Sequence, residues 1–227
     1  MNKQISVLLP GSFFEEDYHR KVSYLSKNKI TRVYLFDHSL NPADDHKAVY
    51  EAKKALSVLL EDQDSNFDLG LCVLNINSRK IDLLFSRFIN PMLDIQNFSL
   101  GLGTGDNKYE NNHVKYSHDI DLIIDNLIRD YDLSLDGTNL FLGGTSQQKI
   151  NLVKKYSVGI NQWLGNSKDL ISIYQKTYNP KTFIGRFSQC LKIDNKSMDL
   201  PDDIEKIFIL KDSNVVNFYS QIDKILS

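Results

Sequence analysis

The sequence predicts an α/β fold in which eight strand–helix units follow one another along the chain. Short apolar runs of strand type alternate with longer amphipathic segments of helical period, and no linker interrupts the alternation. The apolar runs are nearly continuous, as in parallel strands that are covered on both faces. Because parallel strands need helical crossovers, and 227 residues is a compact length for eight units, we expect a single domain, 1–227, closed into a small (β/α)8 TIM barrel. An open doubly wound sheet is the structural alternative.

Each expected strand is an apolar run bounded by polar or glycine-containing segments. In chain order the runs are ISVLL (5–9), RVYLF (32–36), LGLCVL (69–74), FSLGL (98–102), NLFLG (139–143), VGINQWL (158–164), TFIGRFSQCL (182–191) and IEKIFIL (204–210).

The segments between these runs carry apolar residues every three or four positions, which is typical of amphipathic helices. The connection KIDNKSMDLPDD, after the seventh run, is too short for a full helix. We therefore expect that the seventh helix of the barrel, the one that follows the seventh strand, is reduced, and that insertions are short or missing. The expected helices lie at 14–28, 43–62, 80–94, 116–130, 146–156, 167–178 and 213–226.

Composition excludes several classes of protein. The formal net charge is -2 and Lys and Arg are interspersed with Asp and Glu, so the chain lacks the basic field that nucleic acid demands. No apolar run reaches the roughly 18 residues of a membrane span, and the N-terminal run is too short for a signal peptide. Cys72 and Cys190 lie in apolar runs, which favours buried reduced thiols over a disulfide. We expect a cytoplasmic protein with no nucleic-acid or membrane partner.

Three strand ends carry the residues that point to chemistry. In YLFDHSL, Asp37 and His38 follow the second run, and a histidine beside an acid at a barrel rim is suited to proton transfer. In SLGLGTGD, Gly101, Gly103 and Gly105 follow the fourth run. These glycines either admit a flat ring against the main chain or merely let the strand end turn. The spacing is not that of a dinucleotide fingerprint, and Asp106 would repel a phosphate.

The fifth strand end, LGGTSQQK, has the parts of a phosphate site. Gly143 and Gly144 expose backbone amides, Thr145 and Ser146 offer hydroxyls, and Lys149 falls in the first turn of an expected helix. Free N–H groups, a helix N-terminus and a lysine together suit an anion. An ordinary helix cap by Thr145 or Ser146 is the structural alternative. The histidines His46, His113 and His118 show no metal-ligand spacing, so we expect no metal site.

The chain resembles the luciferase-like monooxygenase superfamily. Within that superfamily it resembles the coenzyme F420-dependent reductase and dehydrogenase branch, which includes methylenetetrahydromethanopterin reductase-like proteins. The resemblance is carried, in chain order, by YLFDHSL, LGLCVLNINSR, LGLGTGD and LGGTSQQKINLVKKYSVGINQWLG. The resemblance implies a (β/α)8 barrel with the flavin or deazaflavin across the strand ends. It implies that His38 donates or accepts the proton and that Asp37 fixes the ring or the histidine. Cys72, Val73 and Asn75 would lie by the ring, with a non-proline cis peptide beneath it. The remaining implied contacts are Gly101, Gly103 and Gly105 at the ring and its polar tail, and Gly143, Gly144, Thr145 and Lys149 at the phosphate.

The function that the resemblance implies is an oxidoreductase that passes hydride between F420 and a small organic substrate. An FMN-dependent monooxygenase of the same fold is one alternative, and a non-catalytic flavin-binding or structural barrel is another. Members of the resembled family are commonly longer, which implies that the pocket is either open or roofed by a neighbouring subunit. We also keep a homodimer open, because the helices at 43–62 and 80–94 are apolar enough to pack on a partner.

Overall fold

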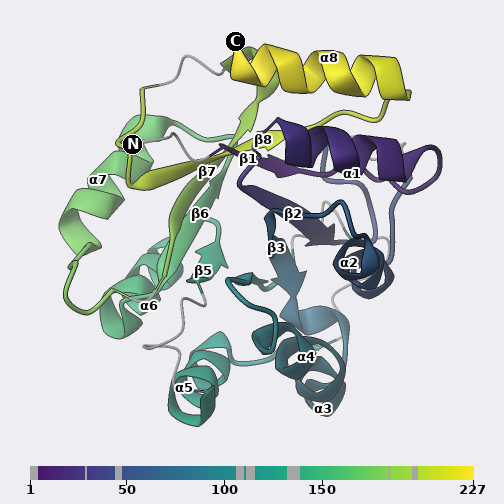
Figure 1. The fold of residues 1–227 in the computed structure, drawn as a ribbon. Helices are drawn as coiled ribbons and strands as arrows, with labels where there is room; N and C mark the ends of the chain where they lie inside the picture. The colour runs from purple at the N-terminus through teal and green to yellow at the C-terminus, as the bar shows by residue number, and fades with distance from the viewer. Residues whose placement is uncertain are drawn as a thin grey trace.

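The barrel expected from the sequence is present in the computed structural model of the chain, which describes residues 5–28, 30–43, 48–105, 110, 116–131, 139–183, 185–195 and 199–227. The eight strands in these ranges pair in chain order, and the last pairs with the first, so the sheet closes on itself. Every neighbouring pair is parallel. The strands are β1 (Ile5–Leu8), β2 (Arg32–Asp37), β3 (Asp68–Asn75), β4 (Ser99–Gly103), β5 (Asn139–Gly143), β6 (Gly159–Trp163), β7 (Phe187–Lys192) and β8 (Ile204–Ile209) (Figure 1).

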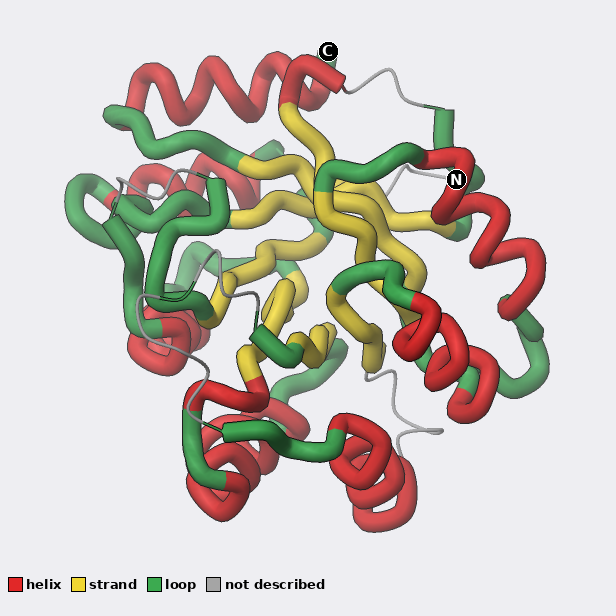
Figure 2. The backbone as a smooth tube through the Cα atoms, turned by 180° about the vertical axis from the view of Figure 1, so that it is seen from behind, coloured by secondary structure: helices red, strands yellow, loops and turns green. Residues whose placement is uncertain are grey.

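Helices surround the strands, as the view from behind shows most directly (Figure 2). Several begin at the side-chain caps that the sequence offers: Ser146, Asn166 and Asn214 each accept a hydrogen bond from a backbone N–H of the first turn. No helix of the described residues is long and apolar enough to cross a membrane. The helices are α1 (Tyr18–Lys27), α2 (Ala52–Glu61), α3 (Ile81–Leu84), continued by the π-helical turn η2 (Phe85–Ile89) and α4 (Asn90–Leu93), α5 (Ile120–Tyr131), α6 (Gln147–Tyr156), α7 (Ser167–Thr177) and α8 (Val215–Leu226).

Two apolar layers hold the barrel together. The outer layer lies between strands and helices and contains alternate strand residues such as Val33 and Leu35. The inner layer fills the barrel with the side chains that point the other way, as the period of two along a strand requires. Its buried members are Leu8, Tyr34, Phe36, Cys72, Phe141, Cys190, Ile207 and Ile209.

A polar cluster lies inside the barrel toward the N-terminal ends of the strands. Its centre is Glu205, which accepts hydrogen bonds from Ser6 Oγ and, at 2.8 Å, from Tyr34 Oη. Arg32 and Arg186 place guanidinium nitrogens 3.6 and 3.4 Å from its carboxylate. The buried carboxylate is thus paired and hydrogen-bonded at this end of the barrel. In (β/α)8 barrels, sites are built at the opposite, C-terminal end.

The sequence predicts a helix over 116–130, but the observed helix α5 begins later, at Ile120. The preceding residues are held by the loop after β3. The backbone N–H of His118 donates to Asn77 Oδ1 (2.7 Å) and that of Tyr116 donates to the Asn77 carbonyl (3.2 Å). These two contacts hold residues 116 and 118 against the loop after β3, and the helix begins after them.

Two other helices also begin later than predicted, each for a local reason. The helix predicted over 14–28 begins only at Tyr18, because Asp17 is left-handed, with φ 49°. The helix predicted over 43–62 begins at Ala52. Asn41 holds the chain ahead of it, accepting from the N–H of Ala43 (3.0 Å) and donating to the Ala48 carbonyl (3.1 Å).

The seventh strand also begins later than predicted, at Phe187 and not at residue 182. The backbone N–H groups of Thr182 and Phe183 both donate to the Asn179 carbonyl and form a turn. In the connection after β7, the described residues form a short 3-10 turn, η4 (Ile193–Asn195). This agrees with the expectation that the helix after the seventh strand is reduced.

Candidate functional site

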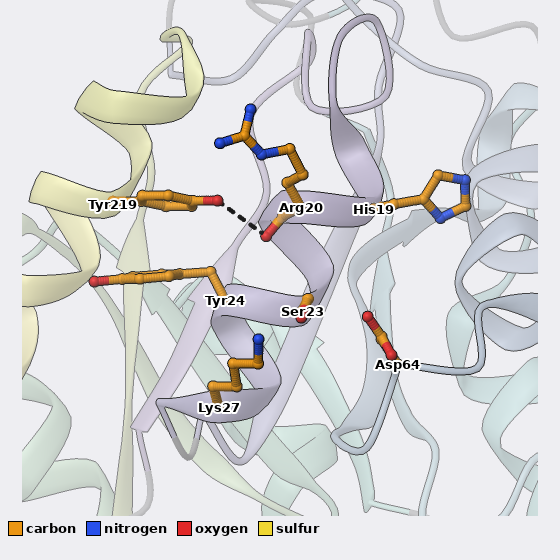
Figure 3. A pocket seen from close by; sticks show the side chains of 7 residues that line it. All are labelled: His19, Arg20, Ser23, Tyr24, Lys27, Asp64 and Tyr219. Atoms are coloured by element: carbon orange, nitrogen blue, oxygen red, sulfur yellow. Dashed lines mark hydrogen bonds between the residues drawn. The ribbon is translucent and has the colours of Figure 1, made fainter.

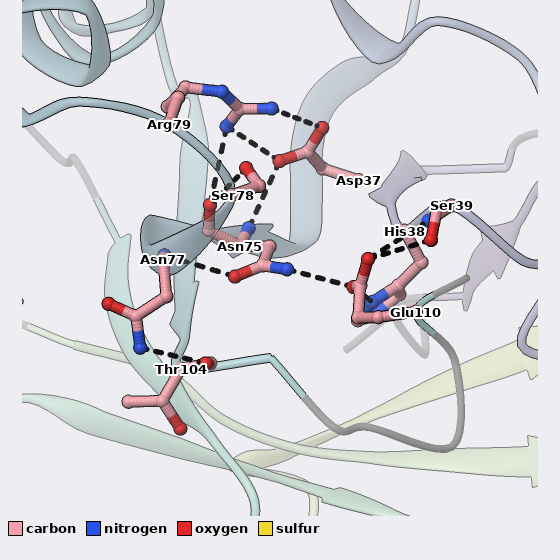
Figure 4. Close-up of polar contacts among 9 residues, drawn as sticks. All are labelled: Asp37, His38, Ser39, Asn75, Asn77, Ser78, Arg79, Thr104 and Glu110. Atoms are coloured by element: carbon pink, nitrogen blue, oxygen red, sulfur yellow. Dashed lines mark hydrogen bonds and ion pairs between the residues drawn. The ribbon is translucent and has the colours of Figure 1, made fainter. Parts of the chain in front are cut away.

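The C-terminal ends of β2, β3, β4 and β5 lie side by side, because these strands are consecutive neighbours in the sheet. They bring together Asp37, His38 and Asn75, which sequence reasoning selected from separate stretches. Figure 4 shows these residues with the loop residues that contact them. In the close-up Asn75 contacts two carboxylates, Asp37 through its backbone N–H and Glu110 through its side-chain amide.

Asp37 pairs with Arg79. The guanidinium approaches both carboxylate oxygens, with Nη1 2.8 Å from Oδ2 and Nη2 2.9 Å from Oδ1. Oδ2 also accepts from the Asn75 N–H at 3.1 Å, and the guanidinium carbon of Arg79 lies 3.9 Å from the centre of the Phe88 ring. These contacts fix the loop after β3 against the end of β2. The role expected for Asp37, holding the ring or the histidine, stays a prediction.

His38 pairs with a different acid, Glu110. Nδ1 of His38 lies 3.0 Å from Oε1 of Glu110, and the two side chains are only 10% and 8% exposed. Ser39 Oγ donates to Oε2 at 2.9 Å and Asn75 Nδ2 donates to Oε1 at 2.8 Å. Burial raises the pKa of Glu110, but the hydrogen bonds from His38, Ser39 and Asn75 outweigh it and leave the pKa below its ordinary value. The carboxylate is therefore held ionised beside the imidazole.

Glu110 was missed by sequence reasoning. It lies in the polar stretch YENNH, where no periodicity marks one acid above its neighbours. The available signal was its position in the loop after the fourth strand, next to the strand that ends in Asn75. Of the other residues considered, Asp106, His46 and His113 lie outside the described residues.

Asn75 ties the two pairs to the loop that follows β3. Its Oδ1 accepts from the Asn77 N–H at 3.0 Å, which starts the turn η1 (Ile76–Ser78). Asn77 Nδ2 in turn donates to the Thr104 carbonyl at 2.9 Å, and His118 Nε2 lies 2.8 Å from the Arg79 carbonyl. The ends of β2, β3 and β4 are therefore cross-linked by side chains.

The peptide bond between Cys72 and Val73 is cis, as the resemblance implied. The pairing of β3 with both neighbouring strands shifts register between Leu71 and Leu74, around this bond. The Val73 side chain turns toward β4 and β5: a Cβ built on Gly103 would lie 2.4 Å from Val73 Cγ2, and one built on Gly143 would lie 2.8 Å from Cγ1. These two glycines make room for Val73.

The other glycines of the fourth strand end have separate reasons. A Cβ on Gly101 would lie 2.4 Å from the Phe141 ring, so this glycine admits an aromatic side chain of the barrel interior. Gly105 has φ 81°, which favours glycine, and it faces the Asn75 amide. Phe141 is fully buried whereas Val73 is partly exposed, so of these two side chains Val73 is the one that a bound ring could contact.

The fifth strand end has a capped helix and a folded-back lysine. Gly144 adopts φ 90°, and Ser146 is the N-cap of α6. Lys149 Nζ donates to the Gly143 carbonyl. Thr145 is half-buried in the turn between the strand and the cap. The arrangement puts an ammonium group and a helix N-terminus at one corner of the C-terminal opening of the barrel, which we call the mouth. Binding of phosphate at this corner stays a prediction.

Outside the barrel, a surface pocket of about 340 Å³ lies along α1. Figure 3 shows its lining: His19, Arg20, Ser23, Tyr24, Lys27, Asp64 and Tyr219. None of the residues that the sequence selected lines this pocket.

Comparison with known proteins gives a likeness of fold. No protein-family model and no curated protein matches the chain. Among solved structures, an F420-dependent secondary alcohol dehydrogenase in complex with an F420–acetone adduct matches with a TM-score of 0.65. The match covers 99% of this chain and 98% of that one, at 11% sequence identity. The chain therefore has the fold of that enzyme, a parallel (β/α)8 barrel, along essentially its whole length.

Proposed function

We propose that this protein is an oxidoreductase that binds a deazaflavin cofactor, coenzyme F420, across the C-terminal mouth of the barrel and passes hydride to or from a small organic substrate. The proposal combines the resemblance of the strand ends, the fold shared with an F420-dependent dehydrogenase and the polar residues gathered at the mouth. It is carried by one observation, the contact between His38 and Glu110.

The His38–Glu110 pair can hold and move a proton where the reaction would occur. When Nδ1 carries a proton, it donates to Oε1 of Glu110. The carboxylate then stabilises the positive charge that the imidazole gains on taking up a second proton. Asn75 and Ser39 keep the carboxylate in position. Hydride transfer to a carbonyl needs such a proton source, and the reverse oxidation needs a base.

The residues at the mouth fit the cofactor. Lys149, the α6 N-terminus and the left-handed Gly144 offer a corner for an anionic tail. Val73, with Gly103 and Gly143 beside it, offers a small apolar surface for the ring. When bound, the deazaflavin supplies the hydride chemistry, and this chain supplies orientation and the proton.

The two alternatives lead to different binding behaviour. An FMN-dependent monooxygenase would use the same mouth with reduced FMN and oxygen, and a non-catalytic barrel would turn over neither. Titration of the purified apoprotein with F420 and with FMN, followed by absorbance and fluorescence, tests the proposal. We expect saturable binding of F420 and weak binding of FMN. A preference for FMN would favour the monooxygenase, and no binding of either would favour the non-catalytic barrel.

A further inference from the structure

Two cysteine side chains from distant strands meet inside the barrel. Cys72 is on β3 and Cys190 is on β7, 118 residues further along the chain, and their Sγ atoms lie 3.8 Å apart. Both are free thiols and both are buried, at 5% and 0% exposed. The proton-transfer pair does not use them. We propose that Cys72 and Cys190 form a modification site in which mild oxidation closes a reversible disulfide across the barrel interior.

The distance between the sulfurs is short enough for this reaction. A disulfide bond is about 2.0 Å long, so the sulfurs have to approach each other by about 1.8 Å. Rotation of two side chains and a small movement of the strand can supply that approach. Strand β3 shifts register relative to both of its neighbours between Leu71 and Leu74, the stretch that contains Cys72.

The surroundings of the pair favour an intramolecular reaction. The thiols lie among Leu8, Phe36 and Ile209 of the inner apolar layer. Asn161 donates to Cys190 Sγ at 3.5 Å and is itself linked to Ser188. Because the chain has two cysteines in all, each thiol has the other as its only thiol partner within the molecule.

The chemistry requires a two-electron oxidant, and a peroxide is the class that fits a buried site because hydrogen peroxide is small. One thiolate attacks a peroxide oxygen, the O–O bond breaks, and a sulfenic acid and hydroxide form. The second sulfur then attacks the sulfenic sulfur, the S–S bond forms and water leaves. Two thiols lose two protons and two electrons, and the peroxide becomes two water molecules. The hydrogen bond with Cys190 and burial both raise the pKa of the Cys72 thiol, so the reaction will be slow.

Closing the disulfide would also act on the mouth of the barrel, a consequence that rests on the proposed function. Cys72 is joined directly to Val73, and the Val73 side chain fills the space beside Gly103 and Gly143. Drawing Cys72 toward β7 would move Val73 away from the surface proposed for the ring. We therefore expect the oxidised protein to bind F420 more weakly than the reduced protein.

Thiol counting on the apoprotein tests the inference without any cofactor. The protein is exposed to hydrogen peroxide, the peroxide is removed, and the chain is denatured in N-ethylmaleimide and weighed by mass spectrometry. We expect the reduced chain to take up two maleimides and the oxidised chain none, with migration as a monomer on a non-reducing gel and full recovery by dithiothreitol. Thiols that stay reactive, disulfide-linked dimers, or a loss that dithiothreitol does not reverse would each overturn the inference.

Single-cysteine variants supply the matched control. Cys72→Ala and Cys190→Ala each keep one thiol in the same interior. That thiol can still react with peroxide but has no second thiol in the molecule to attack, so we expect each variant to gain the mass of oxygen, whereas the wild-type chain loses the mass of two hydrogens. A wild-type chain that gains oxygen as the variants do, with no loss of two hydrogens, would contradict the disulfide. The outcomes separate the two proposals: a chain that forms the disulfide but binds no F420 refutes the proposed function, and one that binds F420 but keeps both thiols refutes the disulfide.

Discussion

His38 and Glu110 form a partly buried acid–imidazole pair, with Nδ1 and Oε1 3.0 Å apart, although 71 residues of chain lie between them. The pair depends on the barrel closing in strand order, because His38 follows β2 and Glu110 lies beyond β4. Asn75, at the end of the strand between them, donates to the same carboxylate oxygen. The geometry makes His38 the residue whose replacement should affect chemistry more than binding.

His38→Asn should lower turnover by about 10²- to 10⁴-fold while F420 affinity changes little, because general acid–base catalysis is worth about that much. Turnover is measured by following the cofactor absorbance with a panel of alcohols, imines and enones. His19→Asn is the matched control, since His19 also pairs with a carboxylate, Asp62, at 2.6 Å, but on the outer surface. Full activity of His38→Asn would remove the residue from the chemistry, and loss of cofactor binding would give it a holding role instead.

Glu110→Gln should remove a pH-dependent part of the stability. The folded-state pKa of Glu110 lies below its ordinary value of 4.5. The ionised carboxylate therefore stabilises the fold fully above that value, and the contribution is lost as the pH falls through the lowered folded pKa. Urea unfolding from neutral to acid pH measures the difference in unfolding free energy between wild type and variant. We expect the difference to shrink below pH 4.5. A constant difference for Glu110→Gln would contradict the pairing.

Lys149→Ala should weaken F420 binding by about 1.5 to 3 kcal/mol, roughly 10- to 150-fold, the range for a lost charge-assisted hydrogen bond. The variant should still fold, because Lys149 lies in the first turn of α6, where alanine is a good helix former. Lys154→Ala, on the exposed face of the same helix, is the control. Unchanged affinity for F420, with equal binding of a phosphate-free deazaflavin, would mean that the corner binds no phosphate.

Gly103→Ala should destabilise the barrel by about 1 to 3 kcal/mol, because the new methyl group would meet Val73 Cγ2 at 2.4 Å in a packed interior. Shortening the neighbour should relieve the clash. In a double-mutant cycle with Val73→Ala, we expect the pair to cost about 0.5 to 3 kcal/mol less than the sum of the single changes. Additive effects, measured by chemical denaturation, would show that Val73 and Gly103 do not share this space.

The barrel could be predicted because its strands are nearly continuous apolar runs, and their burial on both faces leaves that pattern in the sequence. β1, β5 and β8 match their predicted ranges to within a residue. The starts of α2 and α5 could not be predicted, because Asn41 and Asn77 hold the preceding backbone through side-chain contacts that have no periodicity.

The candidate site was predictable only in part, for a related reason. Asp37 and Asn75 end strands and His38 directly follows one, and a strand end in a barrel has a known position. Glu110 lies in a polar loop and Arg79 after a short turn, so their partners depend on the three-dimensional path of those loops. The pairing of Asp37 with Arg79, and of His38 with Glu110, followed from no pattern in the sequence.

A crystal structure of the protein soaked with F420 would test the proposed function most directly. We predict deazaflavin density at the C-terminal mouth, with the ring against Val73 and near His38, and with the phosphate close to Lys149 and the start of α6. A ring found in the surface pocket along α1, or a mouth that takes up no cofactor at saturating F420, would contradict it.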